Sequence, residues 1–154
     1  MHQRSLLVAA FVVVAAVVTS AAKDPFVGTW KLNIAKSKFD GGAPPKSSTA
    51  TITTVGDKRR VAVHTVPTSG PELNTESVAA DDGKDYPMKG SSTVDTVSVI
   101  RIDARTIERR DKKGGNIIAT LRATVSPDGK TLTVTQKGIG AQGPYTNTLF
   151  YDRQ

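Results

Sequence analysis

The side chains that most often carry out chemistry are scarce in this chain and form no catalytic pattern. The 154 residues include two histidines and no cysteine. A zinc site needs three or four Cys, His or carboxylate ligands, so His64 alone predicts none and is expected to be exposed or hydrogen-bonded. No serine lies in a Gly-x-Ser-x-Gly nucleophile turn. The sequence therefore predicts a protein that is not an enzyme, with no metal site and no cofactor.

Two short segments contain residues that other proteins use to bind ions or phosphate. Residues 81–85 read Asp-Asp-Gly-Lys-Asp, but a calcium loop starting at Asp81 would need a glutamate at its twelfth position. That position is Ser92, so Asp-Gly is interpreted as a hairpin turn. The Lys-Gly-Gly of residues 113–115 is also a turn, because no P-loop lysine and hydroxyl follow it.

The chain is basic, with a formal net charge of +7, and its densest clusters are residues 58–60 and 109–113. Nucleic-acid binding usually adds aromatic stacking platforms among basic residues. No aromatic residue lies between Phe39 and Tyr86, or between Tyr86 and Tyr145. The clusters are therefore interpreted as solvated charge beside turns, which discourages edge pairing. No nucleic-acid partner is expected, while an anionic polymer remains an alternative partner.

The elements that position these residues are short strands. Runs of Val, Ile and Thr alternate with turn residues every few positions, a pattern typical of a sandwich or barrel. In residues 116–125 the odd-numbered positions, including Leu121, form an apolar face, and only Ile118 breaks the alternation. Residues 131–137 repeat this pattern, with Leu132 and Val134 inward. The expected strands are 27–33, 48–55, 60–66, 72–79, 85–88, 96–102, 106–111, 116–125, 131–137 and 145–152.

No part of the chain after residue 22 has a helical period over two turns. The predicted fold is therefore all-β, an antiparallel up-and-down barrel of about 8–10 strands, since closure removes exposed strand edges. A two-sheet sandwich remains the alternative, because hydrophobic pattern alone does not separate the two.

The first strand resembles a known family. Residues 26–32, Phe-Val-Gly-Thr-Trp-Lys-Leu, are similar to the opening of the lipocalins and fatty-acid-binding proteins, and residues 149–153 are similar to their closing strand. The resemblance implies a barrel around a ligand cavity, with structural roles for Trp30 across the closed end and for Arg153 above it. Residues 33–46 are too short and too rich in Gly and Pro for that family's two-helix lid. Tyr151 matches the tyrosine of its Arg-x-Tyr carboxylate site, but Leu149 stands in place of the arginine.

The N-terminus has the three parts of an export signal: Arg4, an apolar run over residues 6–18, and small residues up to Ala22. We expect residues 1–22 to be a signal peptide that is cleaved after Ala22, and residues 23–154 to form one domain. An uncleaved anchor is the alternative, although the run is shorter than the roughly 20 residues of a spanning helix. The expected location is periplasmic or extracellular, with no membrane span after cleavage.

These observations favour a secreted or periplasmic lipocalin-like protein that binds a small apolar ligand without catalysis. The ligand-binding candidates are Leu121, Val134 and Tyr151 on the inward faces of the last strands. Small inward residues such as Ala119 and Ala123 leave room for a ligand. The alternative is a packed barrel whose basic surface binds anionic cell-envelope polymers, and the volume of the interior would distinguish the two.

Overall fold

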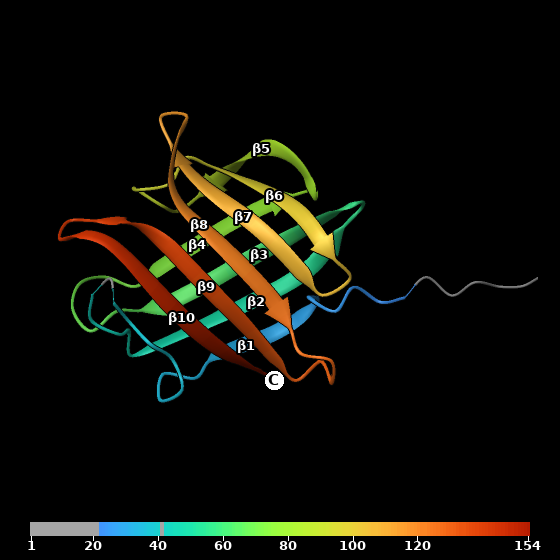
Figure 1. Cartoon of the computed structure of the whole chain (residues 1–154), viewed down its shortest axis with the longest axis horizontal. Helices are drawn as coiled ribbons and strands as arrows, with labels where there is room; N and C mark the ends of the chain where they lie inside the picture. Colours follow the sequence, from blue (N-terminus) through green and yellow to red (C-terminus); the bar gives the residue numbers. More distant parts are fainter. Residues whose placement is uncertain (1–21, 41) are drawn as a thin grey trace, which may run out of the picture.

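The computed structural model describes residues 22–40 and 42–154, and ten antiparallel strands account for most of them (Figure 1). The predicted signal peptide lies outside the described residues except for Ala22. The strands are β1 (Gly28–Leu32), β2 (Ser47–Val55), β3 (Lys58–Val66), β4 (Leu73–Ala79), β5 (Asp82–Lys89), β6 (Thr96–Asp103), β7 (Thr106–Lys113), β8 (Asn116–Val125), β9 (Thr131–Gly140) and β10 (Gly143–Arg153).

Each strand pairs with the next along the chain, and β1 pairs with β10 to close the barrel. In Figure 1 the C-terminus accordingly lies beside β1. The prediction of an up-and-down barrel is confirmed, and the sandwich alternative is wrong. The closing register sets Trp30 opposite Arg153 and Leu32 opposite Tyr151.

The hairpin between β9 and β10 is longer than the sequence predicted. Residues 138–144 were expected to be a turn, yet the two strands continue to a short connection between Gly140 and Gly143. Tyr145 pairs with Gly138. A Cβ atom on Gly138 would lie 2.7 Å from the Tyr145 hydroxyl. Glycine is thus compatible with the strand because the ring of Tyr145 covers it.

Ile118 breaks the alternation of β8 because it is an extra residue in the ladder with β7. Asp111 lies opposite Ala119, whereas Lys112 lies opposite Ile117, so the register shifts between them. Such a bulge turns the residues beyond it to the other face. Ile117 is consequently 52% exposed, and its predicted inward position is wrong.

The buried core has two parts, one at the end of the barrel where the chain enters β1 and one around Val97 on β4 and β6. One cluster of buried residues contains Phe26, Trp30, Ile52, Val125 and Leu132. The completely buried residues include Trp30, Phe26 and Val125. This end is closed by packing.

Between β1 and β2 the chain makes a turn and one isolated bridge, Lys38 to Thr148. No helix occurs in residues 22–40 or 42–154, in keeping with the absence of lid helices expected from residues 33–46. In this described part, no helix is therefore long and apolar enough to cross a membrane.

Candidate ligand-binding cavity

The barrel interior contains a mainly apolar cavity of about 160 Å³ above the buried core. Its lining comes from strands all around the barrel, because side chains at alternate positions of each strand face inward. The lining residues are Phe26, Ala50, Ile52, Arg59, Val61, Val63, Ser77, Ala79, Val99, Ile107, Arg109, Leu121, Ala123, Leu132, Val134, Leu149 and Tyr151.

The three residues predicted to bind a ligand all lie on this lining. Leu121 comes from β8, Val134 from β9 and Tyr151 from β10. Ala123 also lines the cavity, whereas Ala119 is buried elsewhere. The structure thus brings the predicted residues together, and their role in binding stays a prediction.

The closed end lies beneath this cavity, where Arg153 covers the ring of Trp30. The guanidinium carbon is 4.1 Å from the centroid of the indole, within the range of a cation–π contact. The same guanidinium donates three hydrogen bonds of 2.6–2.7 Å to backbone carbonyls, so it ties the last strand to two other parts of the chain. The acceptors are Pro25, Val27 and Gly129.

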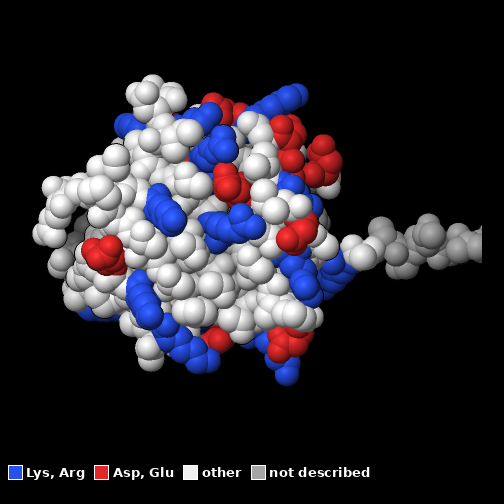
Figure 2. All heavy atoms as spheres, viewed as in Figure 1, with Lys and Arg blue, Asp and Glu red and all other residues white. Residues whose placement is uncertain are grey.

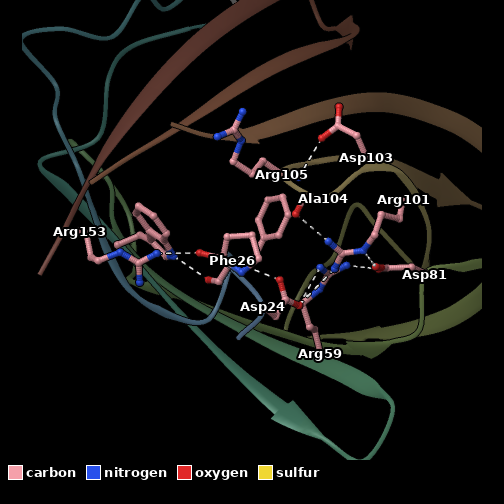
Figure 3. A network of polar contacts seen from close by, with 11 residues as sticks. Asp24, Phe26, Arg59, Asp81, Arg101, Asp103, Ala104, Arg105 and Arg153 are labelled. Atoms are coloured by element: carbon pink, nitrogen blue, oxygen red, sulfur yellow. Dashed lines mark hydrogen bonds and ion pairs between the residues drawn. The ribbon is translucent and has the colours of Figure 1, made fainter. Parts of the chain in front are cut away.

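Beside Phe26, two arginines and two aspartates form an ion-pair network (Figure 3). Arg59 bonds Asp24 and Asp81, and Arg101 bonds the same two carboxylates. Both guanidinium groups also lie within 6 Å of the Phe26 ring centroid, at 5.1 and 5.7 Å. The sequence predicted a solvated charge at Arg59, but its side chain is only 8% exposed. That prediction is wrong because Asp24, in the segment before β1, pairs with Arg59.

A second ion pair lies inside the barrel on β7. The Nε of Arg109 donates to the Oδ1 of Asp111 at 2.5 Å, and the two side chains are 21% and 8% exposed. The sequence interpretation placed Arg109 with solvated turn charges, and this is also wrong. The two-residue period of a strand was the missed signal: Ile107, Arg109 and Asp111 share one face of β7.

Tyr151 lines the cavity, and Ser48 and Arg109 act on its hydroxyl. Burial raises its pKa above the ordinary value, while a hydrogen bond with Ser48 and the charge of Arg109 partly oppose that rise. Tyr151 is therefore a neutral phenol at neutral pH and can both donate and accept a hydrogen bond.

The sequence left open whether the interior is packed or holds a ligand cavity, and the cavity volume lies between these two outcomes. Pockets for drug-sized ligands measure about 300–1,000 Å³, and a cavity of about 150 Å³ in another protein holds benzene. A volume of about 160 Å³ therefore matches a ligand of one small ring or a short chain.

His64, the histidine considered from the sequence, lies outside the barrel. His64 is exposed, and its Nδ1 is 2.9 Å from the Oδ1 of Asn74. Within residues 22–40 and 42–154, no three His, Cys, Asp or Glu side chains are close enough to hold a metal ion.

Surface charges of both signs are interspersed on the face that Figure 2 shows. Some exposed basic side chains of the protein pair with carboxylates, as Arg110 does with Glu108 and Lys113 with Asp95. Pairing of this kind weakens the attraction of a basic surface for an anionic polymer.

The comparisons with known proteins identify the fold. No family model matches the chain, and no curated protein matches its sequence. Among solved structures, it is similar to the zebrafish ileal bile acid-binding protein complexed with cholic acid, with a TM-score of 0.52 and 14% identity. The match covers 84% of this chain and 99% of that one.

The class of fold defined by this likeness is a closed antiparallel β-barrel like that of the bile acid-binding protein. The resemblance in residues 26–32 implied the same fold. At 14% identity, the likeness extends to the fold alone.

Proposed function

We propose that the protein is an exported, non-catalytic binding protein that carries a small apolar ligand inside its barrel. The observation that carries this proposal is the apolar cavity of about 160 Å³ above a closed, tightly packed end. A void of this size lined by Leu, Val and Ile side chains costs stability when it is empty, and an apolar ligand would recover that loss. The likeness to a barrel that is complexed with cholic acid supports binding inside the barrel.

The alternative function, binding of anionic cell-envelope polymers by a basic surface, has weaker support. The interior is not filled, the charges on the face in Figure 2 are mixed in sign, and some basic side chains of the protein are paired with carboxylates.

Displacement of a fluorescent apolar probe tests the binding function. The folded chain from Lys23 onward should bind the probe saturably, and a benzene-sized competitor should displace it. Ala123→Phe fills the cavity from β8 and should abolish binding without unfolding the barrel. Binding that persists in Ala123→Phe, or salt-sensitive binding to an acidic polymer with no probe binding, would contradict the proposal.

Export is tested by the mass of the secreted species. Small residues at Ser20 and Ala22 favour cleavage there, so the mature chain should begin at Lys23. A mature species that retains residues 6–18 would instead indicate a membrane anchor.

A further inference from the structure

Two arginines reach the cavity wall, and each is already paired with carboxylates. Arg59 bonds Asp24 and Asp81, and Arg109 bonds Asp111. A ligand therefore meets cations whose charge is largely cancelled. A carboxylate that entered would be a buried charge without a counter-ion of its own, which is unfavourable in a low-dielectric interior.

Arg109 nevertheless keeps hydrogen-bonding capacity for a ligand. A guanidinium has five N–H donors, and Asp111 accepts from the Nε of Arg109. Within residues 22–40 and 42–154, no acceptor bonds the Nη groups of Arg109. Arg109 is among the residues that line the cavity, and Asp111 is not.

From this arrangement we infer that the cavity selects an uncharged ligand, one with an apolar body about the size of benzene and a single hydrogen-bond acceptor that meets Arg109. Hydroxyl, aldehyde and ketone groups fit this description, and a carboxylate does not. The inference rests on the proposed function, since it names the ligand class of the same cavity. Asp111 sets this preference for an uncharged ligand because its carboxylate neutralises the charge of Arg109.

Benzyl alcohol and benzoate form a matched pair of probes, because they share a ring and differ in head-group charge. At neutral pH the wild-type protein should bind benzyl alcohol at least as tightly as benzoate, measured by NMR titration. Asp111→Asn keeps an acceptor for the Nε of Arg109 but removes the counter-charge. It should shift the ratio of the two dissociation constants at least tenfold toward benzoate, about 1.4 kcal/mol.

Glu108→Gln is the matched control, because Glu108 pairs with Arg110 at 3.1 Å on the same strand but outside the cavity. It should leave the ratio unchanged. An unchanged ratio in Asp111→Asn, or an equal shift in Glu108→Gln, would overturn the inference.

Two further measurements decide the matter if Asp111→Asn does not fold. The double variant Arg109→Gln/Asp111→Asn removes both charges together, so its ratio should stay within tenfold of the wild-type ratio. A wild-type preference for benzoate over benzyl alcohol would refute the inference directly. Failure of every variant and the wild type to bind any apolar probe would instead refute the proposed function.

Discussion

Trp30 joins the first strand, the last strand and the closed end of the barrel through a single side chain. It is completely buried, its ring lies beneath Arg153, and its Nε1 donates to the carbonyl of Phe26 at 2.9 Å. Trp30→Ala should lower the free energy of unfolding by about 3–5 kcal/mol, the range for a deleted buried aromatic. Val55→Ala, at an exposed position, should change it by less than about 0.5 kcal/mol. Denaturant unfolding measures both, and a loss below about 1 kcal/mol for Trp30→Ala would mean that the indole is not a core anchor.

Tyr151 provides a second test at the residue scale. Burial raises its pKa, so the neutral phenol is favoured more in the folded than in the unfolded state. Its contribution to stability is then fully present below the unfolded value of about 10 and is lost as the pH rises through the higher folded value. Tyr151→Phe should flatten the fall in stability above about pH 10 and remove a late component from the ultraviolet titration. If Tyr151→Phe leaves both curves unchanged, the hydroxyl is not buried.

Individual residues differ in how far their positions could be predicted from the sequence. Strand alternation was enough to place Leu121 and Val134 inward, because both lie in regular apolar patterns. Arg59 and Arg109 were misplaced because charged residues near turns are usually solvated. Their burial depends on Asp24 and Asp81 in one case and on Asp111 in the other. Asp24 and Asp81 are distant from Arg59 in the sequence and leave no local pattern, whereas the pair of Arg109 and Asp111 follows the two-residue period of β7.

At the scale of elements, β4 and β5 are the neighbouring strands with the fewest paired residues. These strands pair at two positions, Glu76 to Lys89 and Ser77 to Met88. The turn that follows β5 packs directly on β4, since a Cβ atom at Gly90 would lie 1.9 Å from the backbone oxygen of Asn74. Glycine is therefore required at this contact for steric reasons as well as for its positive φ of 75°.

Gly90→Ala should consequently destabilise the barrel more than Gly56→Ala. Both glycines have positive φ, at 75° and 62°, but nothing lies within 4 Å of a Cβ at Gly56. Left-handed strain of about 1–2 kcal/mol is common to both variants, so the clash should add at least about 1 kcal/mol to Gly90→Ala. Thermal unfolding of the pair measures the difference, and equal destabilisation would show that the β5–β6 turn can move away from β4.

The elements themselves were largely predictable, because turn residues and β-branched runs act locally. The bulge at Ile118 was visible as a break in alternation, but its effect on Ile117 depends on the register with β7. The extension of β9 and β10 was missed because glycines at 138 and 140 resemble a loop, while the ring of Tyr145 covers them in the barrel.

At the scale of the whole molecule, the closure of the ten strands can be predicted from the sequence, whereas the volume that they enclose cannot. Strand number and the avoidance of open edges predict closure. Cavity volume depends on how seventeen lining residues fill the space left above the Trp30 cluster. The sequence therefore predicted the barrel, and its interior had to be seen in the structure.

The central claim is that this interior binds a small apolar ligand, and an NMR titration of residues 23–154 with benzyl alcohol tests it most directly. Saturable shifts should be confined to the methyl groups that line the cavity, including those of Leu121, Val134 and Leu149. The exposed methyl groups of Ile100, Ile117 and Ile139 should not move. Shifts at the exposed isoleucines alone, or no saturable shift at the lining residues, would contradict the account.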